Sequence, residues 1–243
     1  MYTIYIIPDT HHVNSMPLPL SPTTIWWRNS LYVAIGASLF YTWYVITADG
    51  YFNLVSFAKV MAGTANFLFA ASFSLSSIGY YFNFLDTKVI YRKYLGLLGF
   101  FAALIYTLLL PIVRPDYYFY GFFDHLWSSD VLLGAGAMAI FTMMALISNN
   151  EAIQTIGPVR WRQLLRLGYV AFFLLVIRAI LNNENPIGAD ARPEMWQVYL
   201  SNPEGLPPVR LVFSVIAMAV IFFRLSVEFD KWWGQKHPKP SLP

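Results

Sequence analysis

Long apolar stretches alternate with short polar breaks along most of the chain. Six stretches are long enough, or nearly so, to cross a bilayer as helices: Leu31–Ala48, Val60–Leu85, Tyr94–Val113, Val131–Ser148, Leu164–Leu181 and Leu211–Val227. A hydrocarbon core of about 30 Å takes roughly 20 apolar helical residues. Because unpaired backbone groups are costly in hydrocarbon, each stretch must be helical. The pattern therefore predicts an all-α, polytopic membrane helical bundle with about six transmembrane helices.

The breaks between the stretches carry residues that end helices. Asp49-Gly50 follows the first stretch, and Arg114-Pro115-Asp116 follows the third. Gly, Pro, Asn and Asp are typical of turns and helix ends. We see neither an internal repeat nor a second soluble domain. We therefore predict one transmembrane domain over residues 25–233, with a polar, Pro-rich N-terminal tail over 1–24 and a C-terminal tail over 234–243.

The composition agrees with a membrane protein. Hydrophobic residues make up 57% of the chain and charged residues only 12%, whereas a soluble domain has about 25% charged residues. So few charges leave too little polar surface to cover a water-soluble globule. The net charge of +3 does not indicate nucleic-acid binding, because the basic residues flank apolar stretches. The absence of cysteine excludes disulfides, thiolate metal sites, iron–sulfur clusters and cysteine nucleophiles.

Basic residues are distributed unevenly between the two sides of this topology. Eleven lie on one side: Arg28, Lys88, Arg92, Lys93, Arg160, Arg162, Arg166, Arg224, Lys231, Lys236 and Lys239. Five lie on the other: Lys59, Arg114, Arg178, Arg192 and Arg210. Leaving out Arg178 and Arg224, which lie inside or at the edge of apolar stretches, does not change the imbalance. Since cytoplasmic loops carry the excess of Lys and Arg, both termini are expected to be cytoplasmic.

Two polar segments on the other side are candidate sites. The longest loop, residues 182–208, contains Trp196, Tyr199 and several prolines; it is either a solvated connector or a docking surface for an extracytoplasmic partner. Asp124 and His125 lie beside aromatic residues and suggest a metal ligand pair or an acid–base group. One histidine and one carboxylate are too few for a metal site, so the pair is interpreted as a polar cap before a helix, and no metal is predicted.

Three ordered motifs carry a resemblance to a known family. They are Gly63-Thr64-Ala65-Asn66, the run Arg92-Lys93-Tyr94-Leu95-Gly96-Leu97-Leu98-Gly99-Phe100, and a string from Ser148-Asn149-Asn150 through Trp161, Leu164 and Arg166 to Tyr169. Over about 63–233 the chain resembles the ferric reductase-like transmembrane domain family. The nearest likeness is to the haem-binding membrane subunit that passes electrons to a periplasmic methionine sulfoxide reductase. This resemblance implies a bacterial inner membrane protein.

The resemblance also implies where haem ligands should lie. Members of the family bind b-type haem through histidines on the third and fifth helices, and the corresponding positions here hold Tyr106, Leu165 and Arg178. None of the four histidines falls in an apolar stretch: His11, His12, His125 and His237. Haem ligation of this kind needs an imidazole on the iron. We therefore expect a haem-less relative with no bound cofactor.

Tyr106 and Arg178 leave a second interpretation open. Tyr is a known haem ligand as a phenolate, and Arg178 is a candidate for the cation that stabilises one. Arg178 is otherwise expected to snorkel to the extracytoplasmic surface or to pair with a polar group, with Tyr106, Asp124 and Asp130 as candidate partners. Tyr106 and Arg178 are thus candidate cofactor-binding residues under this interpretation only.

Two functions follow from these expectations. The first is a non-catalytic structural or accessory subunit of a larger membrane complex, whose partners are other integral membrane subunits and lipid. The alternative is an electron-transfer subunit that passes electrons from quinol to an extracytoplasmic oxidoreductase through a cofactor held by non-histidine ligands. A transporter is disfavoured because inverted repeats and broken helix pairs are not evident. We see no nucleophile–base constellation, phosphate loop or dinucleotide fingerprint, and we predict no catalytic residue.

Overall fold

The computed structural model describes residues 22–82, 90–120, 122–181, 206–207 and 209–236, and every regular element in these ranges is helical. Six helices are long, and three are short. The elements, in chain order, are α1 (Pro22–Asp49), α2 (Leu54–Tyr81), α3 (Tyr91–Val113), the π-helix η2 (Asp116–Tyr120), α4 (Phe122–His125), α5 (Ser129–Leu146), α6 (Asn150–Ile156), α7 (Pro158–Leu181) and α9 (Val209–Lys236).

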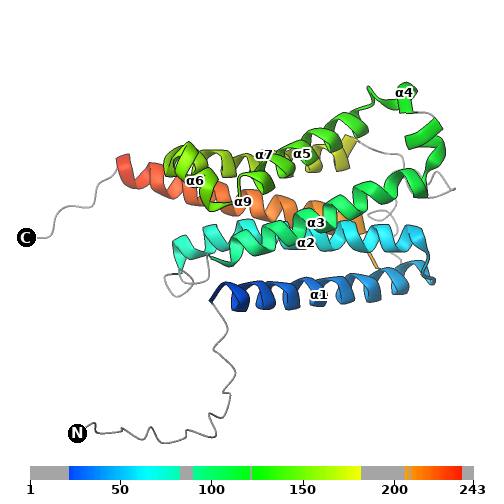
Figure 1. Ribbon diagram of the computed structural model, residues 1–243, viewed down its shortest axis with the longest axis horizontal. Helices are drawn as coiled ribbons and strands as arrows, with labels where there is room; N and C mark the ends of the chain where they lie inside the picture. The colour runs from blue at the N-terminus through cyan, green and yellow to red at the C-terminus, as the bar shows by residue number, and fades with distance from the viewer. Residues whose placement is uncertain (1–21, 83–89, 121, 182–205, 208, 237–243) are drawn as a thin grey trace, which may run out of the picture.

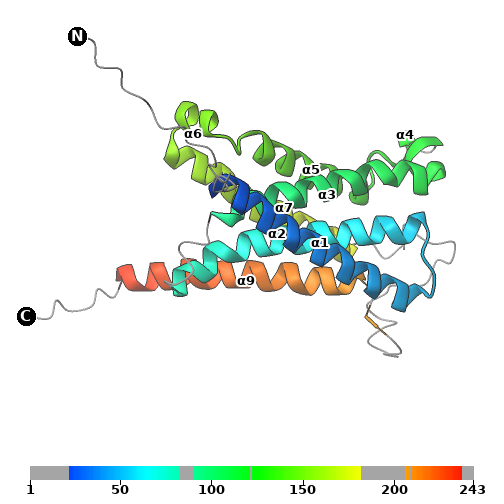
Figure 2. The ribbon, with the colours of Figure 1, turned by 60° about the horizontal axis from the view of Figure 1, so that its bottom comes forward.

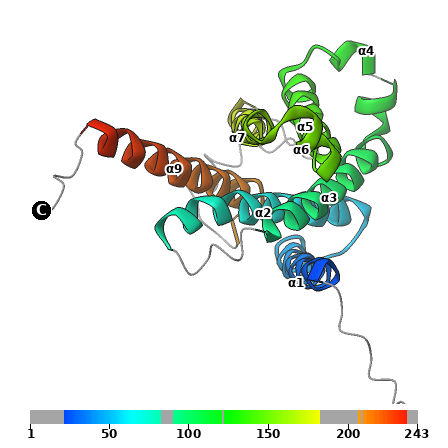
Figure 3. The same cartoon turned by 60° about the vertical axis from the view of Figure 1, so that its left-hand side comes forward.

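The six long helices lie side by side along the long axis of the molecule (Figure 1). Each runs opposite to the long helix before it, so that α6 lies at one end of the bundle and η2 and α4 lie at the other. Helix α2 is central, because it packs against α3, α1 and α9, while α5 packs against α7. Figure 2 shows α9 beside α2, and Figure 3 shows α1 on the side of the bundle opposite α5 and α7.

Four of the helices are long and apolar enough to cross a membrane: Thr23–Asp49, Leu54–Tyr81, Tyr91–Val113 and Leu211–Trp233. Helix α5 contributes a shorter apolar segment, Val131–Leu146. Helix α7 has 24 residues and carries four arginines. The prediction of a helical membrane bundle is thus confirmed in its helical class and in the presence of spanning candidates, whereas the total of about six spans remains a prediction.

Local sequence explains where the helices begin and end. Asn53 precedes α2 and its side-chain Oδ1 accepts a hydrogen bond from the backbone N–H of Ser56 at 2.8 Å, which satisfies one of the free amides of the first turn. Gly50, at φ +76°, makes the turn after α1, a conformation that glycine adopts without steric cost. An ion pair of 2.7 Å between Lys59 and Asp49 joins the two helix ends.

Aromatic rings fill the core between α2, α5 and α7. The rings of Phe69 and Phe141 stack with their centroids 4.1 Å apart and their planes 10° apart. Phe172 meets both of them edge-on at 6.3 Å, and Phe73 meets Phe172 edge-on at 5.3 Å. Such stacked and edge-to-face pairs are the favoured geometries of aromatic side chains. Ala217 and Val220 extend this core onto α9.

Candidate functional site

The three positions expected to hold haem ligands lie on two helices with different neighbours. Tyr106 is half-buried on α3, which packs mainly against α2 and α1. Leu165 and Arg178 lie on α7, which packs mainly against α5 and α9. Thirteen residues of helix separate Leu165 from Arg178 by about 20 Å.

The Arg178 guanidinium lies in the interface between α7 and α5. A Cβ atom added to Gly134 of α5 would lie 2.9 Å from Nη1 and 3.1 Å from Cζ of Arg178. Because Gly134 has no side chain, the Arg178 guanidinium can occupy the adjacent space. The neighbours expected for Arg178 from the sequence were Tyr106, Asp124 and Asp130, and Gly134 was not among them.

The residues present do not fit a haem held in the manner of the family that the sequence resembles. Leu165 has no atom that binds iron, and the histidines lie outside the apolar stretches. The core where α2, α5 and α7 meet is closed by the ring contacts of Phe69, Phe141 and Phe172. Phe172 is fully buried among them.

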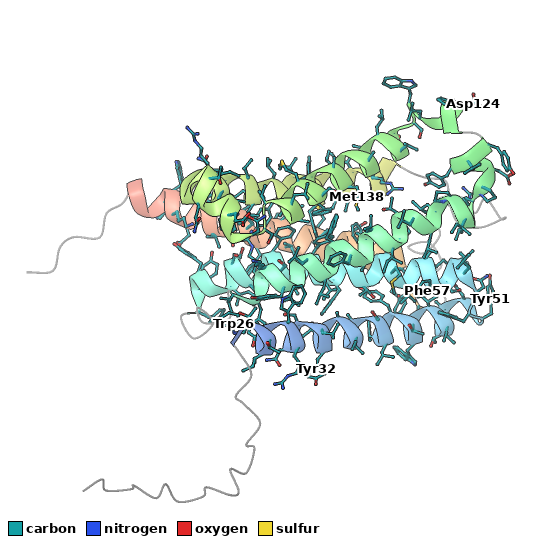
Figure 4. The ribbon with its side chains drawn as sticks, in the orientation of Figure 1. Trp26, Tyr32, Tyr51, Phe57, Asp124 and Met138 are labelled. Carbon is teal, nitrogen blue, oxygen red and sulfur yellow. The ribbon has the colours of Figure 1, made fainter. Side chains whose placement is uncertain are left out.

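The Asp124–His125 pair lies in α4, at the end of the bundle opposite α6. Asp124 is exposed, and Figure 4 shows it at the outer edge of the molecule. Within the described ranges, no three His, Cys, Asp or Glu side chains gather to form a metal-binding group. The His125 side chain, the three other histidines and most of the proposed docking loop at 182–208 lie outside what the structure describes, so these interpretations remain predictions.

An arginine–aromatic stack lies in the half of the bundle that contains α6. We use this term for Arg92, Phe73, Tyr169 and Arg224. The guanidinium of Arg92 lies 5.8 Å from the centroid of the Phe73 ring, the rings of Phe73 and Tyr169 are 5.0 Å apart, and the guanidinium of Arg224 lies 5.6 Å from the Tyr169 centroid. Cations over aromatic faces are attracted by the ring quadrupole, so each of the two rings attracts one of the two cations.

Hydrogen bonds fix the stack to four helices. Arg92 Nη1 donates to Ser76 Oγ at 2.7 Å, and the Tyr169 hydroxyl donates to the backbone carbonyl of Phe73 at 3.3 Å. Arg224 forms an ion pair with Glu228 one turn along α9. The stack therefore joins α2, α3, α7 and α9. Most of these residues stand out in the sequence, either within motifs or as charges near apolar stretches, but nothing in the sequence indicates that they meet. The signal that could have found the site is a charge inside an apolar stretch.

A buried amide lies in the centre of α2. Asn66 is 3% exposed, and its side-chain Oδ1 and Nδ2 have no hydrogen-bond partner among the described residues. Burial of an unpaired amide costs free energy. Asn66 ends the Gly63-Thr64-Ala65-Asn66 motif, whose first residue packs against the ring of Tyr41 on α1. The motif thus places the buried Asn66 amide and the close contact between α2 and α1 within one helical turn.

Taken together, the described residues define a helical bundle with helices suited to crossing a membrane and a core closed by aromatic rings. No protein-family model matches the chain, and no curated protein matches its sequence. Membership of the ferric reductase-like family therefore remains a prediction.

Proposed function

We propose that the chain is an integral membrane protein that serves as a non-catalytic accessory subunit of a larger membrane complex. The observation that carries the proposal is the closed interior. Phe69, Phe141 and Phe172 fill the space between α2, α5 and α7 with direct ring contacts, and the apolar stretches contain no histidine. An interior of this kind offers no histidine from the apolar stretches to a haem iron and is compatible with a scaffold.

The outer face of α1 is suited to contact with another membrane helix. Helix α1 packs against α2 and α3, and its other side presents large side chains, among them Tyr32 at 63% and Trp43 at 59% exposure. Figure 4 shows Tyr32 directed away from the bundle. Aromatic residues are enriched where protein surfaces meet. Either lipid or a helix of a partner subunit can cover this face. Under the proposed accessory role, a partner helix covers it.

The distribution of charge supports an orientation in which the α6 end faces the cytoplasm of a bacterial inner membrane. In the described part, the α6 half holds nine basic residues: Arg28, Arg92, Lys93, Arg160, Arg162, Arg166, Arg224, Lys231 and Lys236. The acidic residues in the same half are Glu151, Glu228 and Asp230. In the other half four basic residues balance four acidic ones. Excess Lys and Arg mark the cytoplasmic side.

The test is extraction of the chain from its native membrane in mild detergent, followed by an absorption spectrum and identification of co-purifying subunits. We expect one or more membrane proteins at fixed stoichiometry and no Soret band. Trp43→Ala together with Tyr32→Ala should release the partner, whereas Phe222→Ala, an equally exposed position on α9, should not.

A different result would refute the accessory role. A b-type haem spectrum at one haem per chain would contradict it and would favour an electron-transfer subunit. In that case Tyr106→Phe together with Arg178→Leu should abolish the spectrum if these residues hold the cofactor. Purification as a lone chain from every detergent that preserves its fold would equally contradict an accessory role.

A further inference from the structure

A pocket lies between α1, α2 and α3 in the α6 half of the bundle. Three polar and three apolar residues form its walls: Asn29, Ser30, Val33, Leu75, Tyr91 and Leu95. Its volume is about 290 Å³. Since a water molecule takes about 30 Å³ in the liquid, the pocket admits roughly ten groups of that size. This is room for a segment of a larger molecule.

The walls of the pocket change from polar to apolar along the axis of the bundle. At one end the side-chain Nδ2 of Asn29 donates a hydrogen bond to the Tyr91 hydroxyl at 3.0 Å, which joins α1 to α3. Val33 and Leu95 each follow one of these residues by four positions, so they lie about 6 Å farther along the same two helices. Because α1 and α3 run in the same direction (Figure 1), both walls become apolar toward the centre of the bundle. This gradient fits an amphipathic molecule whose polar part lies at the α6 end.

The polar end of the pocket lies where a membrane surface is expected. The ring of Tyr94 lies 6.2 Å from that of Trp26 and 5.0 Å from that of Trp27. The next residue of α1, Arg28, is exposed, as is Lys93 in the first turn of α3. Trp and Tyr concentrate at the boundary between membrane and water. The ester groups of phospholipids lie at the same boundary, between the headgroups and the acyl chains.

One polar residue of the pocket is buried without a hydrogen-bond partner in the described part of the chain. Ser30 is 1% exposed, and its hydroxyl has no partner there. By contrast, Thr42 and Thr47 of the same helix donate to backbone carbonyls four residues earlier, at 2.8 and 2.9 Å. Asn66 and Ser77 also carry unpaired buried atoms, but neither residue lines the pocket. Because an unpaired buried hydroxyl costs free energy, an acceptor oxygen in the pocket would stabilise Ser30.

We propose that the pocket binds one membrane glycerophospholipid through its ester region. An ester carbonyl oxygen accepts the hydrogen bond of Ser30, since a carbonyl is an acceptor only and the hydroxyl is a donor. The glycerol lies beside Asn29 and Tyr91, and one acyl chain extends along Val33 and Leu95. Recognition therefore depends on the ester linkage and not on the charge of the headgroup. The lipid site is independent of the accessory role, since it requires only that the bundle lie in a membrane.

The test uses the full chain, purified in detergent and analysed by native mass spectrometry with diphytanoyl phosphatidylcholine or its ether-linked analogue. The two lipids have the same headgroup and the same branched chains, and only the ester lipid has carbonyl oxygens. We expect the ester lipid to be retained about fivefold better, which corresponds to about 1 kcal/mol for one hydrogen bond. Ser30→Ala should abolish this preference. Ser77→Ala, at a buried serine that likewise has no partner among the described residues, should keep it.

A second pair of variants tests whether the lipid occupies the pocket. Val33→Trp places a large ring at the pocket wall, so it should lower the retention of both lipids. Ile35→Trp is the matched control, since Ile35 is similarly exposed on α1 but does not line the pocket. It should leave the retention of both lipids unchanged.

Four outcomes would overturn the proposal. Equal retention of the two lipids by the unaltered chain would mean that the protein makes no contact with the ester carbonyl. A preference for the ester lipid that persists in Ser30→Ala would place that contact elsewhere. Equal retention in Val33→Trp and Ile35→Trp would remove the lipid from the pocket. A quinone that co-purifies with the chain and is lost in Val33→Trp but kept in Ile35→Trp would assign the pocket to an electron carrier.

Discussion

Replacement of Gly168 by alanine tests how tightly the interior is closed. A Cβ atom at this position of α7 would lie 2.6 Å from Cε1 of Phe73, closer still to its Cζ, and 2.9 Å from Cε of Met144. Carbon atoms in contact prefer about 3.5–4.0 Å, so the Phe73 ring would have to shift by roughly 1 Å. Phe73 is 2% exposed and is bounded by the ring of Tyr169 at 5.0 Å and that of Phe172 at 5.3 Å.

Because neighbouring rings oppose such a shift, Gly168→Ala should lower the free energy of unfolding by about 1–3 kcal/mol, the usual cost of overpacking. Gly36→Ala is the control, since nothing lies within 4 Å of a Cβ atom at that position of α1. There alanine should be neutral or should stabilise the helix by up to about 1 kcal/mol. Unfolding in mixed micelles, followed by circular dichroism as the fraction of sodium dodecyl sulfate rises, gives both values.

A second variant identifies the cause of the destabilisation. Phe73→Leu makes room beside position 168, so Gly168→Ala should cost less in that background, with a coupling free energy of about 0.5–3 kcal/mol between the two sites. Equal stability of Gly168→Ala and Gly36→Ala, or simple additivity of Gly168→Ala and Phe73→Leu, would refute a rigid contact between α7 and the Phe73 ring.

Three further predictions test the interior and the orientation. Phe69→Ala should destabilise the bundle by about 3–5 kcal/mol in the same unfolding assay, because it removes one ring of the central stack and leaves a cavity; a cost below about 1 kcal/mol would mean that the core is loosely packed. Asn66→Leu should raise stability by about 1–3 kcal/mol, because it removes an unpaired buried amide, whereas a loss of stability would show that the amide has a partner in the membrane. In intact cells a membrane-impermeant maleimide should label Tyr51→Cys, at the α4 end, but not Glu151→Cys, at the α6 end, and the reverse pattern would invert the topology.

The positions of the long helices follow from the sequence because apolar length is a local property. Helix α3 begins at Tyr91 and ends at Val113, within three residues of the expected stretch at both ends. Helix α9 continues to Lys236, beyond the expected end at Val227. A helix can extend past its apolar segment into polar residues. The short helices α4 and α6 lie in what the sequence suggested were breaks, because segments of four and seven residues are too short to show a period.

The arrangement of the arginine–aromatic stack was not predictable in the same way. Arg92, Phe73, Tyr169 and Arg224 are far apart in the sequence, and their meeting depends on how four helices rotate about their axes. Apolarity on several faces of a membrane helix gives little information about that rotation. Tyr106 and Arg178 were expected to act as a pair through family resemblance, and the structure places the Arg178 guanidinium next to Gly134 of α5.

The surroundings of the arginines in the bundle bear on whether these residues conduct charge or stabilise the fold. A charge inside a membrane protein commonly marks a path for protons or ions, and such a path needs polar groups in succession across the bilayer. Here Arg92 and Arg224 are held by aromatic faces in one half, and Arg178 lies in the space left by Gly134 in the other. Between them lie the stacked rings of Phe69 and Phe141, which neither donate nor accept protons. The aromatic layer thus separates the two charged regions, which supports a structural role for the arginines over a conducting one.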